Sequence, residues 1–530
     1  MTLDLRVFEL DGETGANGTD QENGISAVLD VLGQAFGVVT EHGAGARQHT
    51  WLDTFDWRLY RAGLVLEYEH ARRGGRLVLN RDGAPEAEQP VQGWRTSRPR
   101  LAADLPAGPI RDQVLKLASP RALLPMATAV GTVTVTRLLN ADGKTVARLT
   151  VDHSTVTRGD RTVPLPLRLA ITEVRGYPGQ ARRAAQLVAG APGVSQADRS
   201  AFATALAALG RHPNDYSGGV TAEITAQMPA SVAVATLLLS LLDTLEQNVD
   251  GTLRDIDTEF LHDLRVAVRR TRSAIKLLGD VLPAGLAEAY APEFKWLGDL
   301  TTPTRDLDVH LLGFDAMAES LVAASPADLE PFRAFLARRR VREVRRLATG
   351  LRSARFRATT DHWRKALLEV RDARPARKSP TADELAVART SRTFRKVASH
   401  GAAITAASPP TALHDLRKRC KELRYVLEFF APLHNPVVYR KVLGDLKQLQ
   451  DCLGEFQDSQ VQREEIHALA DAMLAERAAP ATTLLAMGEI AANLALRQDE
   501  ARAEFAQRFA RFAGREGQQR FHVLLTRASQ

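Results

Sequence analysis

The sequence is poor in cysteine and in aromatic residues. Only two cysteines, Cys420 and Cys452, occur in 530 residues. Both fall on predicted apolar helix faces, which indicates reduced thiols in the core of a cytoplasmic protein. Neither a disulfide framework nor a cysteine metal site is expected. Aromatic residues make up 6% of the chain. This leaves few rings on which a nucleic-acid-binding surface can stack bases.

A secretory signal and a long apolar run are also missing. Met1–Leu10 contains acidic residues and no basic segment followed by an apolar one, so we expect no signal peptide. The longest uncharged stretch lies between Glu223 and Asp243 and contains glutamine, proline, serine and threonine. It predicts a core helix and no membrane span. No cofactor is expected.

Charge is distributed unevenly along the chain. The net charge is only +7, but Pro331–Arg424 contains 25 Lys and Arg against 8 Asp and Glu, so the remainder is net acidic. Such a segment implies a polyanionic partner. The alternative is a set of solvated helix faces whose arginines pair with acids elsewhere in the fold.

The length predicts two or three domains. Residues 1–212 are predicted to mix helices with strands, and residues 213–219, rich in Pro, Asn and Gly, to form a linker. In residues 220–530, apolar positions recur every three or four residues, which predicts an all-α domain. The clearest β-branched strand patterns are Gly131–Leu138, Thr145–Asp152 and Leu167–Val174.

The helical part contains an internal repeat. Leu261-His262-Asp263-Leu264-Arg265 recurs as Leu413-His414-Asp415-Leu416-Arg417, an offset of 152 residues. The register holds without insertion over residues 261–309 and 413–461. We therefore predict two copies of a helical hairpin, each extended into a bundle and related by a pseudo-two-fold axis.

Each copy carries a row of basic residues along one helix face. The spacings of three and four residues place these side chains in one stripe. A parallel apolar stripe lies beside it, so the cations flank the core seam. The first stripe comprises His262, Arg265, Arg269, Arg272 and Lys276. The second comprises His414, Arg417, Lys421 and Arg424, with Lys418 beside them.

Like charges crowded beside a core cost stability unless carboxylates or a bound anion compensate them. Arginine matches phosphate oxygens bidentately, lysine adds a mobile charge, and histidine can gain a proton next to an anion. Four acids on the facing helices are expected to orient the arginines: Asp299, Asp306, Asp451 and Asp458. Alternatively, the histidines are core or capping residues and the arginines only pair with these acids.

Residues 220–530 resemble the CHAD domain, a histidine-containing helical family associated with polyphosphate. The resemblance rests on His262 through Arg272, Lys295-Trp296-Leu297-Gly298, Arg305-Asp306-Leu307-Asp308, His414 through Phe430, and Leu446 through Asp458. It implies two antiparallel four-helix bundles around a basic channel. It also implies inorganic polyphosphate as the ligand and a location at polyphosphate granules.

The segment Trp51 through Leu64 resembles the early part of the CYTH domain, the triphosphate-tunnel family that often precedes CHAD modules. This resemblance implies an N-terminal α+β domain with a tunnel-like β-barrel. An unrelated α+β domain is the alternative.

The expected catalytic residues of that family are largely replaced. The chain opens Leu3-Asp4-Leu5-Arg6 in place of Glu-x-Glu-x-Lys, Glu67 and Glu69 stand where the family has Arg, and Asn80 stands near an expected Lys. The later acidic strand keeps only Glu173. One carboxylate is too few for the Mg²⁺ or Mn²⁺ of a triphosphatase, so we expect a degenerate tunnel without a metal site. Arg137 and Asp152 are the candidate survivors.

Three functions remain in competition. Polyphosphate binding by the helical domain is favoured. A metal-dependent tripolyphosphatase in the N-terminal tunnel is the first alternative. Nucleic-acid binding by the Arg-rich segment Arg338–Arg357 is the second, although no nucleic-acid motif is present. The oligomeric state and the preferred polyphosphate length stay open.

Overall fold

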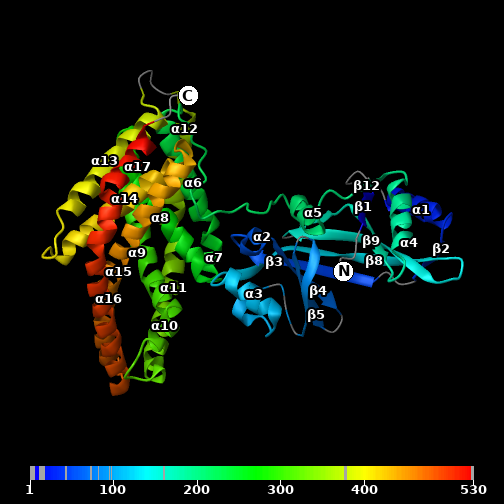
Figure 1. The fold of residues 1–530 in the computed structure, drawn as a ribbon, viewed down its shortest axis with the longest axis horizontal. Helices are drawn as coiled ribbons and strands as arrows, with labels where there is room; N and C mark the ends of the chain where they lie inside the picture. The colour runs from blue at the N-terminus through cyan, green and yellow to red at the C-terminus, as the bar shows by residue number, and fades with distance from the viewer. Residues whose placement is uncertain are drawn as a thin grey trace. The chain divides into compact units, whose positions relative to one another are not determined.

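The computed structural model describes residues 6–10, 18–41, 45–71, 74–81, 83–92, 94, 96, 98–158, 161–374 and 379–526. The chain divides into two compact units, Met1–Ser217 and Gly218–Gln530 (Figure 1). The predicted opening segment from Leu3 to Leu5 lies outside the described residues.

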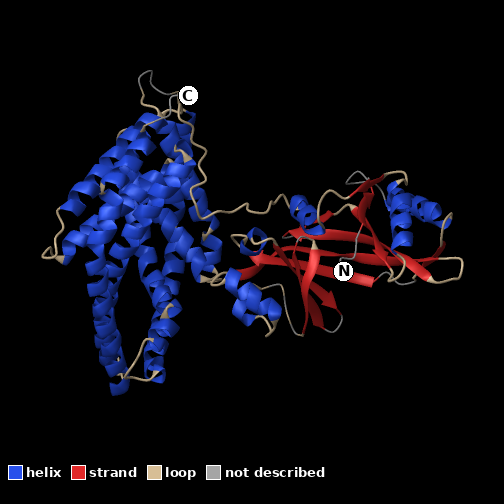
Figure 2. Cartoon of the chain, viewed as in Figure 1, coloured by secondary structure: helices blue, strands red, loops and turns tan. Residues whose placement is uncertain are grey.

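The first unit is built on one antiparallel sheet, drawn in red in Figure 2. Its main strands follow the order β12-β1-β11-β9-β8-β3-β4-β5-β6, and β10, β2 and β7 pair with β9, β8 and β8. The strands are β1 (Arg6–Leu10), β2 (Gly37–Thr40), β3 (Gly45–Thr54), β4 (Leu64–Ala71), β5 (Gly74–Arg81), β6 (Ala84–Val91), β7 (Arg100–Leu101), β8 (Ala122–Leu139), β9 (Thr145–Arg158), β10 (Arg161–Pro164), β11 (Leu167–Glu173) and β12 (Val194–Gln196).

The sheet is open, so the prediction of a β-barrel is wrong. Among the described strands, the terminal strands β6 and β12 each pair on one side only. Pro85 and Pro90 interrupt β6, and proline cannot donate a hydrogen bond to a neighbouring strand. β12 has only three residues. The three strand patterns predicted from the sequence are confirmed, within β8, β9 and β11.

Helices cover the sheet and complete its cores. Helix α1 (Gly18–Gly33) and helix α4 (Pro178–Ala189) pack with β1, β8, β9 and β11 around Leu149 and Leu169. Helix α3 (Pro109–Ala118) closes a second core over β4 and β5, and α5 (Ala201–Ala208) packs on Trp51 in a third. The mixed α and β composition predicted for this part is therefore observed.

The Trp51–Leu64 segment forms a strand, a tight turn and the short helix α2 (Arg58–Arg61). Asp53 is buried and accepts the backbone N–H groups of Thr54, Leu59 and Tyr60 at 2.7, 3.0 and 2.9 Å. Burial, opposed by these hydrogen bonds, raises the pKa of Asp53 to about 6. The carboxyl group fixes the turn and thereby the register at which β4 returns beside β3.

The second unit is helical. Its longer helices are α6 (Ala230–Gln247), α8 (Thr258–Leu278), α9 (Leu286–Leu312), α11 (Glu330–Leu351), α12 (Ala354–Asp372), α13 (Ala382–Ala402), α14 (Pro410–Phe429), α15 (Pro436–Ala475), α16 (Ala481–Ala513) and α17 (Arg515–Leu525). Two short helices, α7 (Val249–Leu253) and α10 (Phe314–Glu319), connect them.

The uncharged stretch predicted to be a core helix is α6. By length and composition alone, Ala230–Leu253 could cross a membrane, but 61% of its apolar window is buried within the unit. Its leucines pack against α8 and α12, around side chains such as Leu264 and Leu367. The amphipathic α8 and α12 thus bury their apolar faces on it.

The basic helices α8 and α14 each pair with the following long helix. α8 packs on α9, α14 packs on α15, and α8 also contacts α14. Asp257 caps α8 by accepting the N–H groups of Glu259 and Phe260 at 2.9 and 3.2 Å. Proline occupies the first position of α14, where its missing N–H costs nothing.

We predict that Gly218–Gln530 folds without the preceding unit. Three of the hydrophobic clusters lie within it, and Arg270 donates to the Gly218 carbonyl at 2.7 Å, which gives the fragment a defined start. Circular dichroism should show a helical spectrum with one cooperative thermal transition. A fragment that is soluble yet unfolds without a transition contradicts this prediction.

Candidate functional site

The arginines of α11, α12 and α13 are largely paired within the second unit. Arg340 contacts Asp308 at 2.6 Å and Asp255 at 2.7 Å, and burial raises the pKa of that Asp308 carboxyl. Arg355 pairs with Glu293 at 2.8 Å, and Arg364 pairs with Asp243 and Glu246 at 2.7 and 2.6 Å. Part of the positive charge in this stretch of the sequence is therefore paired with acids of the same unit, whereas described arginines such as Arg338 and Arg339 have no ion pair and lie near the Phe335 ring.

Between α8 and α14 the structure forms two adjoining cavities of about 440 and 600 Å³. We call them together the α8–α14 groove. The first extends towards Asp306 and His310 on α9, and the second towards Arg424 and Asp451. Both are lined by His262, Val266, Arg269, Arg417, Lys421 and Asp458.

Most of the predicted site residues line this groove, but five of them lie outside it. Lys276 pairs with Glu422 at 2.6 Å and is 71% exposed, and Lys418 pairs with Asp415 at 3.3 Å. Two others contact the neighbouring helices, since Arg272 lies against Gly298 and His414 is 2.6 Å from Gln457. Asp299 pairs with Lys295 of its own helix at 2.8 Å. Predicted residues that line the groove are His262, Arg265, Arg269, Arg417, Lys421, Arg424, Asp306, Asp451 and Asp458.

Acidic residues hold several of the lining arginines. Arg417 donates to Asp458 at 2.8 Å, and Arg424 donates to Glu428 at 2.6 Å. Arg265 donates to Thr302 and lies 4.0 Å from Asp306. Asp458 of α15 thus pairs with Arg417 of α14, whereas Glu428 belongs to the same helix as Arg424.

Arg269 and Lys421 are the exceptions. Among the described residues, neither has a carboxylate within ion-pair distance, and the guanidinium carbon of Arg269 lies 6.0 Å from the centroid of the Tyr425 ring. Burial, and then the neighbouring Arg417 and Arg269, lower the pKa of Lys421 to about 8. These two cations are therefore the part of the groove where positive charge is least compensated.

The two predicted histidines differ in their surroundings. His262 lines both cavities, and burial, followed by the positive charge of Arg305, lowers the pKa of its ring. It is therefore neutral at pH 7 unless an anion restores the proton. His414 lies 2.6 Å from the side-chain oxygen of Gln457 on α15, so its position is fixed by a neighbouring helix.

Sequence reasoning missed Arg305, which lines the first cavity and donates to the Thr258 carbonyl at 3.3 Å. Its position next to Asp306 on α9 was the available signal. It also missed His310, which lies 2.8 Å from Glu465 in the same cavity.

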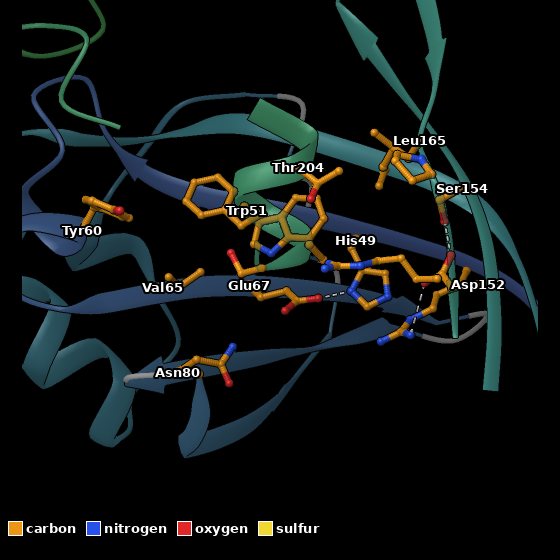
Figure 3. Close-up of a pocket in the computed structure, with 18 of the residues that line it drawn as sticks. His49, Trp51, Tyr60, Val65, Glu67, Asn80, Asp152, Ser154, Leu165 and Thr204 are labelled. Carbon is orange, nitrogen blue, oxygen red and sulfur yellow. Dashed lines mark hydrogen bonds and ion pairs between the residues drawn. The ribbon is translucent and has the colours of Figure 1, made fainter. Parts of the chain in front are cut away.

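The first unit contains a separate cavity of about 590 Å³ (Figure 3). Glu67, Asn80 and Asp152 line it, whereas Glu173 does not. Arg137 instead lies 3.6 Å from Glu41. Glu173, the one carboxylate kept from the expected acidic strand, is therefore not part of this cavity, which Arg47 and Arg168 also line.

Comparison with known proteins agrees with the helical geometry. Residues 236–467 match the model of the CHAD domain family. The chain therefore contains a CHAD domain, formed by the paired basic helices and their neighbours. No curated protein matches the chain.

Three solved structures resemble parts of the chain. The CHAD domain from the plant Ricinus communis is 24% identical, with a TM-score of 0.46, and the match covers 55% of this chain and 95% of that one. PptA from Streptomyces chartreusis is 17% identical, with a TM-score of 0.42 and coverage of 53% and 99%. A candidate adenylate cyclase from Bacillus halodurans is 13% identical, with a TM-score of 0.24 and coverage of 37% and 93%. At these scores the similarity carries no functional argument.

We predict that Lys421 makes stability depend on pH. Its pKa is about 8 in the folded protein and ordinarily 10.5, so the charged lysine destabilises the fold below pH 8. This cost disappears as pH rises from 8 to 10.5. At pH 7, Lys421→Met should unfold at a higher denaturant concentration than the natural protein. Its free energy of unfolding should be higher by about 1 to 2 kcal/mol, after allowance for solvent screening.

The difference between the two proteins should shrink towards pH 10.5. Lys418→Met, at an exposed position on the same helix, is the control and should show no such trend. A stability difference for Lys421→Met that is the same at pH 7 and pH 10 would contradict the assignment.

Proposed function

We propose that the CHAD domain binds inorganic polyphosphate in the α8–α14 groove. The observation that carries the proposal is the pair Arg269 and Lys421, two cations from different helices that line both cavities and lack a carboxylate partner among the described residues. Lys421 is half-buried, and like charges crowded beside a core favour binding of an anion that neutralises them. The family match adds the association of CHAD domains with polyphosphate.

The arrangement of the cations favours an extended ligand. Arg269 and Lys421 are shared by both cavities, while Arg265 and Arg305 lie on the side of the first and Arg424 lies on the side of the second. The sequence repeat relates Arg269 to Lys421 and Arg265 to Arg417 by the same offset of 152 residues. A chain of phosphates with regularly spaced charge can contact both sets of side chains, whereas one compact anion reaches only the centre.

Nucleic-acid binding is less well supported. The Arg338–Arg357 segment, which was its basis, includes Arg340 and Arg355 in ion pairs with acids of other helices. The groove offers Tyr425 as a ring, and Arg269 already lies over it. Bases would therefore find little surface for stacking.

The proposal predicts that Arg269→Gln with Lys421→Gln loses polyphosphate affinity without losing stability. Charge-assisted hydrogen bonds contribute about 1.5 to 3 kcal/mol each, so the double variant should bind about 10²- to 10⁴-fold more weakly. Its melting temperature should stay equal or rise, because the repulsion is relieved. Calorimetric titration with polyphosphate of defined length measures the affinity, and DNA and RNA serve as competitors.

The matched control is Lys276→Gln with Lys418→Gln. It removes the same two charges from the same two helices, at exposed positions outside the groove. If the groove binds the anion, the polyphosphate affinity of the groove variant should depend less on salt than that of the control, because fewer counterions are displaced. Equal salt dependence of the two affinities is expected only if the groove does not bind the anion. Equal affinity of the two double variants would refute the proposal.

A further inference from the structure

Three metal-ligating side chains come together on one face of the sheet in the first unit. His49 of β3 lies directly opposite Glu69 of β4, and Trp51 lies opposite Glu67. Residues two apart on a strand share a face, so Glu67 and Glu69 both flank His49. One donor atom from each of the three residues lies within 4.8 Å of the other two.

The cluster is enclosed. His49 is only 6% exposed, and the side chains of Glu67 and Glu69 are 15% and 25% exposed. One ring nitrogen of His49 contacts Glu67, while Nε2 is buried and has no hydrogen-bond partner in the described part of the chain. Buried polar atoms are nearly always satisfied, so this nitrogen indicates a missing ligand.

Two arginines compensate Glu69 in the structure. Arg47 lies 3.5 Å from it, and Arg76 forms a close ion pair with it. The two arginine side chains are 41% and 48% exposed. They can therefore turn into solvent when another cation binds the Glu69 carboxylate. Exposed ion pairs of this kind contribute little stability.

We propose that His49, Glu67 and Glu69 bind a divalent metal ion of the Zn²⁺ type. An imidazole nitrogen with two carboxylates suits a first-row transition metal better than Mg²⁺, which prefers oxygen ligands alone. Ligand atoms around tetrahedral Zn²⁺ lie about 3.3 Å apart for bonds of 2.0 Å. The three donor atoms now lie within 4.8 Å of one another.

The metal would keep a coordination position open towards the cavity of the first unit. His49 and Glu67 both line that cavity, as Figure 3 shows, and Trp51, Tyr60 and Phe202 form its aromatic wall. Three protein ligands and one open position are typical of zinc sites that bind a further small molecule. This site lies within the first unit and does not depend on polyphosphate binding by the second.

The test is calorimetric titration of full-length protein, purified without a histidine tag and freed of metal with chelator. Zn²⁺ should bind with one ion per chain at this site, and a hundredfold excess of Mg²⁺ should not displace it. Glu67→Gln, which is nearly isosteric, and His49→Ala should each weaken Zn²⁺ binding at least about 100-fold, since even indirect partners of metal ligands contribute 10- to 100-fold.

Two further variants keep the test informative if one protein is unstable. Arg76→Gln removes one of the two arginines that compete with the metal for the Glu69 carboxylate. This variant should bind Zn²⁺ at least threefold more tightly. Glu88 also pairs with Arg76, at 2.8 Å, but lies outside the cluster. Glu88→Gln is therefore the control and should still bind one Zn²⁺. Unchanged Zn²⁺ affinity in Glu67→Gln, or in Arg76→Gln, would overturn the proposal.

Trp51 supplies an optical measurement of the same event. Its ring is stacked on that of His49 at 6.1 Å between centroids. Co²⁺ bound at the site should quench its fluorescence, and Trp51→Phe should reduce the quenching while retaining one ion per chain. Quenching of the same size in Trp51→Phe would place the ion elsewhere.

Discussion

The helical unit depends on bringing two rows of like charge together beside the apolar seam between α8 and α14. Leu264 of α8 and Val426 of α14 are fully buried in one hydrophobic cluster, and each such side chain contributes about 1.5 to 3 kcal/mol on leaving water. This burial holds Arg269 and Lys421 close to one another despite their repulsion. The low pKa of Lys421 reflects that repulsion together with burial. An anion in the groove would relieve it, so the apolar seam also supports the proposed binding site.

Ion pairs divide the arginines of this unit into two groups. Arg340 of α11 and Arg355 of α12 pair with acids on other helices and serve the fold. Those of the groove are held less completely: Asp306 is 4.0 Å from Arg265, and Asp458 pairs with Arg417 but is itself 58% exposed. A phosphate chain can compete for such arginines at little cost, because exposed pairs are weak.

The two proposals assign ligands of opposite charge to the two units. In the first unit, Glu67 and Glu69 occupy one face of an open sheet, next to a buried histidine whose Nε2 has no hydrogen-bond partner among the described residues. These carboxylates are the basis for proposing a cation there. Cation binding there and anion binding in the groove would thus be separate properties of one chain, each set by the charges of its own cavity.

The sequence by itself determined the helices, the strands of β8, β9 and β11, and the cationic stripes, because helical and strand periodicities are local. Tertiary structure decided the rest. Lys276 has the spacing of the first stripe but pairs with Glu422, and Lys418, beside the second stripe, pairs with Asp415; the stripe pattern does not single out either partner. The sheet stays open because its edges are a proline-bearing strand and a very short one. His49 meets Glu69 only through the register of β3 and β4, since a shift of one residue would point it to the other face.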